Sequence, residues 1–145
     1  MDVRDVQSML REDRAEWEAL VALLEARGGR ESVHADSAPS WTIRDVYAHL
    51  ARWIVHSAAD LEGWLEGRPI ASLDGSDDEI NVRWQAEDSA LDLAAARERA
   101  RAAFDRRARA IEAVPAERWG DAVLEKIARA DGAEHYRAHR EYLSS

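Results

Sequence analysis

The sequence predicts an all-α fold, a four-helix bundle formed by a single domain over residues 1–145. Apolar residues recur every three or four positions along four long stretches, which is the period of an amphipathic helix. No stretch alternates apolar and polar residues as a half-buried strand would. The length of 145 residues suffices for one domain with a sizeable core. Four such helices fit either an antiparallel bundle or a bundle with a long crossover connection.

The first helix is expected over residues 3–27, and Gly28-Gly29 should end it. Its apolar stripe consists of Val3, Val6, Leu10, Trp17, Leu20, Val21 and Leu24. Asp13 interrupts this stripe, so we expect it to face solvent or a partner. Residues 30–40 are polar and read as a loop, in which His34 is expected to be solvated.

The second helix is expected from residue 43 to residue 66, where Gly67-Arg-Pro69 follows. Thr42 is a suitable N-cap, and Asp45 can stand in for the longer acid of a capping box. The apolar face consists of Ile43, Val46, Leu50, Trp53 and Ile54. His49 lies on this face. Taken alone, such a histidine is more often a core residue that bonds a backbone carbonyl.

Two further helical regions follow a loop over residues 70–76. One begins near Asp77, and Ser89 either caps a new helix or marks a bend in a longer one. Its continuation has an alanine-rich stripe that Pro115 ends, made of Leu93, Ala96, Ala100, Phe104, Ala108, Ile111 and Val114. The small side chains of this stripe should let neighbouring helices approach closely.

The last helical region is expected over residues 121–143, with a break at Asp131-Gly132. After the break, Asp131 is expected to cap the terminal helix, and Glu134 completes a D-x-x-E box. His135 and His139 follow at a spacing of four, which places them on one face of that helix.

Two histidines at this spacing can bind one metal ion, with bonds of about 2.0–2.1 Å in the case of zinc. The same spacing also occurs on solvated helix faces without any such role. His49 is the third candidate ligand. His56 lies about 10.5 Å along the helix from His49, so the two cannot share an ion, and we interpret His56 as a pocket or interface residue.

These motifs resemble the DinB-like superfamily of metal-binding four-helix bundles, which includes the maleylpyruvate-isomerase-like proteins. Its W-T-x-[RK]-D-x-x-x-H-L-x-x-W motif is matched by Trp41, Thr42, Arg44, Asp45, His49, Leu50 and Trp53, and its H-Y-x-x-H motif by His135, Tyr136 and His139. The run Asp78-Glu-Ile-Asn81 resembles the start of the third helix in the colibactin self-protection (ClbS/DfsB-type) subgroup. The resemblance covers nearly the whole chain. It implies a bundle with a crossover connection and a divalent metal bound by His49, His135 and His139.

Composition narrows the function classes. The formal charge of −9 disfavours binding to nucleic acid, which requires a basic surface. The absence of cysteine excludes a disulfide framework and a thiolate metal site. The first residues lack the basic and apolar regions of a signal peptide, and no apolar run is long enough to span a membrane. We therefore expect a cytoplasmic protein.

The resemblance implies a metal-dependent enzyme which acts on a small electrophile by thiol transfer or hydrolysis, as in detoxification or self-protection. It also implies a low-molecular-weight thiol as a candidate cofactor, and zinc and nickel rank first among the metals. Asp78 and Asn81, by their position in the family, and Tyr47, by its position on the second helix, are the candidates for acid–base catalysis. Two alternatives stay open, namely a non-catalytic bundle that binds a metal or small molecule, and a structural module that forms a homodimer.

Overall fold

Every regular element in the described part of the chain is a helix. The computed structural model describes residues 1–27 and 41–144, so the predictions for Gly28-Gly29, for the loop over residues 30–40 and for His34 lie outside it. The elements are α1 (Val3–Ala26), α2 (Ile43–Leu65), α3 (Asp77–Glu87), α4 (Leu93–Glu112), the 3₁₀ turn η1 (Ala116–Arg118), α5 (Ala122–Arg129) and α6 (Ala133–Ser144). The described residues contain no strand, and the all-α class is confirmed. None of these helices has the length and apolar character needed to cross a lipid bilayer.

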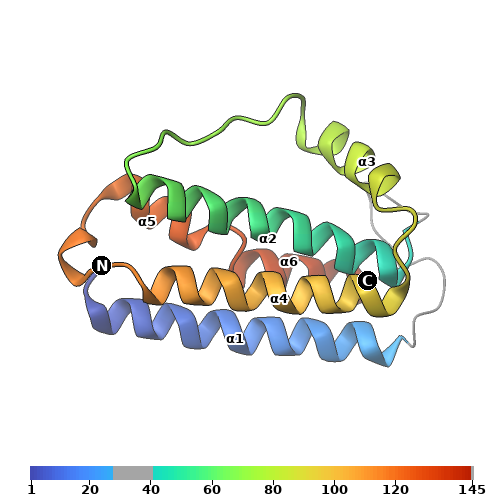
Figure 1. Cartoon of the computed structure of the whole chain (residues 1–145). Coiled ribbons are helices and arrows are strands. Elements are labelled where there is room, and N and C mark those ends of the chain that lie inside the picture. The colour runs from blue at the N-terminus through green and yellow to red at the C-terminus, as the bar shows by residue number, and fades with distance from the viewer. Residues whose placement is uncertain (28–40, 145) are drawn as a thin grey trace.

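The bundle has a long crossover connection, as the resemblance implied. α1 and the α5–α6 segment run in one direction, whereas α2 and α4 run in the opposite direction (Figure 1). Since α2 and α4 are parallel, the chain must travel back along the bundle between them. It does so through residues 66–92, which carry α3 along the outer side of α2. The most extensive packing is between α2 and α4 and between α1 and α6.

Polar side chains at the helix starts explain where the helices begin, because the first N–H groups of a helix lack partners within it. The Asp45 N–H donates to the Thr42 hydroxyl at 3.3 Å, and the Thr42 N–H donates to the Asp45 carboxylate at 2.9 Å. The predicted capping box of α2 is therefore present. Ser76 forms the same type of box for α3. Ser89 lies in the turn between α3 and α4, and the cap of α4 is Asp92.

Replacing Thr42 by alanine should lower the free energy of unfolding by about 1 kcal/mol, because the Asp45 N–H loses its acceptor. Urea denaturation measures this change. Ser76→Ala is the matched control, since it removes the same box from α3, whose only buried residue is Ile80. α3 can fray without opening the bundle, so the control should cost less. Equal losses would contradict this difference between the two helices.

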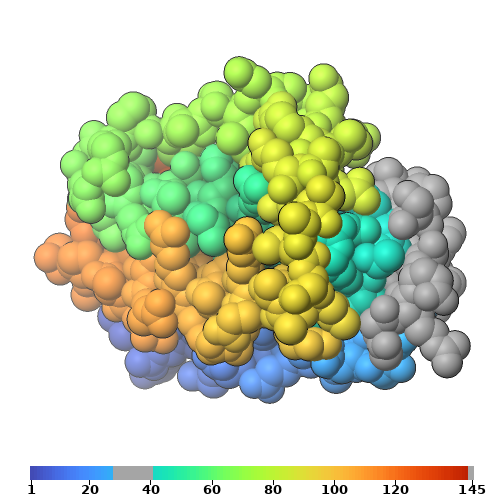
Figure 2. Space-filling view, turned by 45° about the vertical axis from the view of Figure 1, so that its right-hand side comes forward, coloured from blue at the N-terminus to red at the C-terminus, as the bar shows by residue number. Residues whose placement is uncertain are grey.

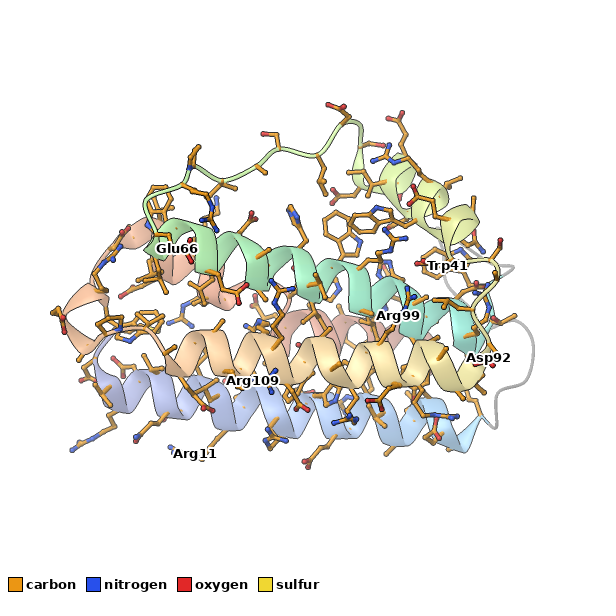
Figure 3. All side chains as sticks on the ribbon, in the orientation of Figure 1. Arg11, Trp41, Glu66, Asp92, Arg99 and Arg109 are labelled. Carbon is orange, nitrogen blue, oxygen red and sulfur yellow. The ribbon has the colours of Figure 1, made fainter. Side chains whose placement is uncertain are left out.

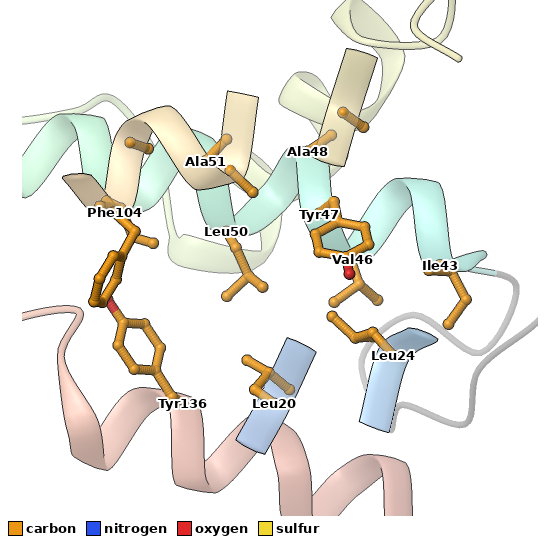
Figure 4. Packing of buried hydrophobic residues seen from close by; sticks show 14 of the residues in the cluster. Leu20, Leu24, Ile43, Val46, Tyr47, Ala48, Leu50, Ala51, Phe104 and Tyr136 are labelled. Carbon is orange, nitrogen blue, oxygen red and sulfur yellow. The ribbon is translucent and has the colours of Figure 1, made fainter. Parts of the chain in front are cut away.

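The core lies among α1, α2, α4 and α6 (Figure 4). Trp17 stacks on Phe104 with ring centroids 5.0 Å apart, and Tyr136 meets Trp17 edge-on at 5.2 Å. The contact between α2 and α4 is built largely from small residues, as the alanine-rich stripe predicted. These buried alanines are Ala48, Ala51, Ala96, Ala100 and Ala103.

Asp13 is buried, with 3% of its surface exposed, so the prediction that it faces solvent or a partner was wrong. Its carboxylate accepts a hydrogen bond from Arg107 Nη1 at 2.8 Å. Arg107 is equally buried and also donates to the carbonyls of Ala128 and Ala130 at the end of α5. The physical reason is that Asp13 faces the break between α5 and α6, where buried backbone groups require polar partners.

The predicted break at Asp131-Gly132 is present, but Asp131 does not cap α6. Asp131 adopts φ 55°, and its carboxylate accepts a hydrogen bond from the Ser57 hydroxyl. The N–H of Ala133, the first residue of α6, donates instead to Asp13 Oδ1 at 2.9 Å. A Cβ on Gly132 would lie 2.7 Å from the same oxygen, so the close approach requires glycine. A side chain from α1 therefore fixes where α6 begins.

Candidate metal centre

Three histidine side chains from two helices meet between α2 and α6. His49 extends from α2, whereas His135 and His139 extend from α6. His139 Nε2 lies 3.3 Å from His49 Nε2 and 3.2 Å from His135 Nε2. One ligand atom from each histidine lies within 4.8 Å of the other two. The structure thus brings together the three residues that the sequence assigned to a metal, although they are far apart along the chain.

The nitrogen positions suit a single small divalent ion. Two nitrogens that each lie about 2.0–2.1 Å from an ion, at the tetrahedral angle, are about 3.3 Å apart. The His49–His139 and His135–His139 separations of 3.3 Å and 3.2 Å match this value, and the ligand atoms of His49 and His135 lie within 4.8 Å of each other. Imidazole nitrogen is also a preferred ligand of zinc, nickel, copper and iron. The donor set therefore fits the metal that the sequence motifs implied.

Burial keeps the three imidazoles neutral near pH 7. Burial, together with the charge of His135, lowers the pKa of His49 to about 4, although the nearby Asn81 side chain acts in the opposite direction. The pKa of His139 is lowered by burial and by the other two histidines. Burial also lowers the pKa of His135, against the effect of the Asp131 carboxylate. A neutral ring can bind a metal without first losing a proton.

Aromatic side chains and α3 enclose the His49 end of the cluster. Asn81 of α3 accepts a hydrogen bond from Trp53 Nε1 at 2.7 Å, and Trp84 packs against Trp53 with ring centroids 4.8 Å apart. Trp41, just before α2, packs against His49 with centroids 5.0 Å apart. Packing against Trp41 therefore restricts the conformation of the His49 ring.

Asp78 and Tyr47 form no hydrogen bond or ion pair with the three histidines in the described structure. Asp78 is exposed on the first turn of α3. Tyr47 is buried, and its hydroxyl donates to Glu25 of α1 at 2.8 Å. Burial and the Glu25 carboxylate raise the pKa of Tyr47, so the phenol keeps its proton at neutral pH. Of the three candidates for acid–base catalysis, Asn81 alone contacts the cluster, through His49.

The sequence did not indicate that Asp131 lies beside the histidines. Its Oδ1 is 3.8 Å from His135 Nε2. Asp131 and His135 are four residues apart, a spacing that can bring two side chains together. Because Asp131 was expected to cap the terminal helix, its position beside the histidines was not predicted. His56 lies apart from the cluster, with Nε2 3.4 Å from Asp60 Oδ2.

The metal-free protein should lose stability as the pH falls from about 6.5 towards 4. Histidine in an unfolded chain titrates near pH 6.5, whereas the pKa of folded His49 is about 4. Between these values the unfolded state binds more protons, so acid favours unfolding, while above pH 6.5 this contribution to stability is fully present. The lowered pKa values of His135 and His139 act in the same sense.

Urea unfolding of the metal-free protein at pH 7.5, 6.5, 5.5 and 4.5 measures this effect. A His49→Gln variant lacks one of the three titrating groups, and its stability should decline less steeply over the same range. An identical decline in the two proteins would contradict the low pKa of His49.

The sequence comparison agrees with this geometry. The family model of the mycothiol maleylpyruvate isomerase N-terminal domain matches residues 12–140, which include all three histidines. Neither the curated proteins nor the solved structures give a significant match. The colibactin self-protection subgroup, which the sequence motifs implied, stays a prediction. Because the match covers most of its length, the chain belongs to the family of mycothiol maleylpyruvate isomerase N-terminal domains, within the DinB-like superfamily.

Proposed function

We propose that this protein is a metal-dependent enzyme whose divalent ion, zinc or nickel, is held by Nε2 of His49, His135 and His139. The observation that carries the proposal is the separation of 3.2–3.3 Å between the facing nitrogens, which is the distance that a shared ion requires. Three protein ligands leave further coordination positions for a reactant. The proposed reaction is thiol transfer to a small electrophile, or its hydrolysis.

The family supports a low-molecular-weight thiol as the cofactor, because its name pairs mycothiol with an isomerase. A bound divalent metal would act as a Lewis acid that lowers the pKa of a thiol or water at the open position. A reaction that consumes such a thiol suits the reducing cytoplasm, which is where we place the protein. The colibactin self-protection subgroup would fit the same chemistry with a strained electrophile as the reactant.

Three features of the protein would support this reaction. Burial keeps the imidazoles in the neutral form that can bind a metal. Contacts from Trp41 and Asn81 restrict the ring of His49. The side chain of His135 is 34% exposed, so a reactant can approach the cluster from the α6 side.

Proton transfer requires a further group. Asn81 is an amide that does not titrate, and we assign it an orienting role towards His49. Asp78 lies three residues before Asn81 and therefore on the same face of α3, which keeps it as a candidate base. Tyr47 is bonded to Glu25 and has a raised pKa, so it is a poor base. Asp131 Oδ1 lies 3.8 Å from His135 Nε2, so its carboxylate is at the edge of the cluster, on the side of the nitrogen assigned to the metal.

The test is a turnover assay with zinc-loaded and nickel-loaded protein, mycothiol or glutathione as the thiol, and 1-chloro-2,4-dinitrobenzene or maleylpyruvate as the electrophile. Consumption of the thiol by 1-chloro-2,4-dinitrobenzene, with release of chloride, or isomerisation of maleylpyruvate without net loss of thiol should depend on the metal and should be lost in His139→Ala. Stoichiometric metal binding without turnover of any combination would favour the alternative, a non-catalytic binding protein. Analytical ultracentrifugation of the same samples tests the proposed homodimer.

A further inference from the structure

A surface groove lies between α2 and α4, beside the turn that follows α3. Its volume is about 430 Å³. Figure 2 shows this groove in the surface between α4 and the crossover segment, and α2 forms the deepest part of it. None of the three histidines lines it. The groove (the α2–α4 groove below) is large enough for a small organic molecule.

The floor of the α2–α4 groove is apolar. It is formed by the methyl groups of Ala48, Ala51, Ala102 and Ala103, which leave space that larger side chains would fill. Val55 and Leu91 extend this apolar surface, and Val55 is 38% exposed to solvent. An aliphatic or alicyclic group placed here would remove this apolar surface from water.

The charged residues that line the groove are Arg52, Arg99 and Arg106 and one acid, Asp88. Two further carboxylates lie just outside the lining, because Glu87 is 3.5 Å from Arg52 and Glu62 is 2.6 Å from Arg106. The groove can therefore attract an anion with an apolar body only where a guanidinium group is not already paired.

Two of the three arginines are already engaged. Arg52 donates to both oxygens of Asp88, at 2.8 Å and 3.1 Å, and lies over the Trp84 ring at 5.6 Å. Arg106 donates to Glu62 at 2.6 Å. The carboxylate of Asp88 is buried, so these contacts hold the Arg52 wall of the groove in place.

Arg99 is the cation with donors to spare. Its side chain is 58% exposed, and its nearest carboxylate oxygen, on Asp88, is 3.9 Å away, beyond hydrogen-bond distance. Figure 3 shows Arg99 on α4. Its planar guanidinium can bind a carboxylate through two parallel hydrogen bonds.

We propose that the α2–α4 groove binds a small carboxylate with an aliphatic body. The aliphatic body lies on the alanine floor, and the carboxylate accepts hydrogen bonds from Arg99. This site is distinct from the metal cluster, because none of its lining residues is one of the three histidines.

The probe that tests the proposal is octanoate, compared with octan-1-ol, which has the same chain length but no charge. Methyl NMR spectra of the full-length protein with ¹³C-labelled alanine report binding at the groove, because four alanine methyl groups form its floor. Octanoate should shift the signals of Ala48, Ala51, Ala102 and Ala103 and bind more tightly than the alcohol, by up to about fivefold, as expected for one exposed ion pair.

Arg99→Gln should remove that preference for the carboxylate. Arg14→Gln is the matched control, because Arg14 lies at the separate groove between α1 and α4 and its loss changes the net charge equally. It should leave octanoate binding unchanged, as should His135→Ala, which separates this proposal from the metal site. Equal affinity for octanoate and octanol, unchanged affinity in Arg99→Gln, or signals that shift at Ala22 of the other groove would each overturn the proposal.

Discussion

Replacing His135 by alanine should abolish stoichiometric metal binding. Two nitrogens would remain, from His49 and His139, and structural and catalytic zinc sites ordinarily need at least three protein ligands. The expected result is about one ion per chain in the wild type and close to none in the variant. Elemental mass spectrometry of protein purified without a histidine tag gives the metal content, and calorimetric titration with zinc and nickel gives the affinity.

His56→Ala is the matched control, since it removes a histidine from α2 that is paired with Asp60 outside the cluster. It should retain full metal content, while His49→Ala and His139→Ala should behave like His135→Ala. Wild-type affinity should fall as the pH drops and protons compete for the imidazoles. Full metal content in all three cluster variants would refute the assignment.

Arg107→Ala should lower the free energy of unfolding by about 3–5 kcal/mol, the usual cost of removing one partner from a buried ion pair. Both side chains are almost fully buried, so the variant leaves the Asp13 carboxylate without its cation. It also leaves the carbonyls of Ala128 and Ala130 without a donor. Urea denaturation with circular dichroism measures the loss.

Arg106→Ala is the neighbouring control. Its ion pair with Glu62 is exposed, with side-chain exposures of 41% and 39%, so its loss should cost no more than about 1 kcal/mol. A double-mutant cycle with Asp13→Asn and Arg107→Met isolates the coupling between the buried partners. If Arg107→Ala costs no more than Arg106→Ala, the buried pair does not stabilise the fold in the way described.

Local signals in the sequence were sufficient for the positions of the helices and for the start of α2. The capping box of Thr42 and Asp45 requires residues only three positions apart, and the structure contains it. The same holds for the helical spacing of His135 and His139. The crossover connection came from the resemblance, because periodicity alone does not set the direction in which neighbouring helices run.

Contacts between distant segments were not predictable in this way. Asp13 reads as a surface residue because its partner, Arg107, is 94 positions away. Likewise, Asp131 was a plausible cap until Asp13 was found to bond the first N–H of α6. Such errors occur where the hydrogen-bond partner of a buried polar group belongs to another helix. The periodicity of a sequence indicates which positions are buried, but it does not indicate which residue is the partner.

The cap that α1 supplies to α6 has a consequence for biosynthesis. Asp13 and Ala133 are 120 residues apart, so the start of α6 is fixed only after Ala133 has left the ribosome. Synthesis proceeds at about 5–20 residues per second, so α1 is complete several seconds before the His135–His139 pair is made. The three imidazoles can therefore meet only late in the synthesis of this domain.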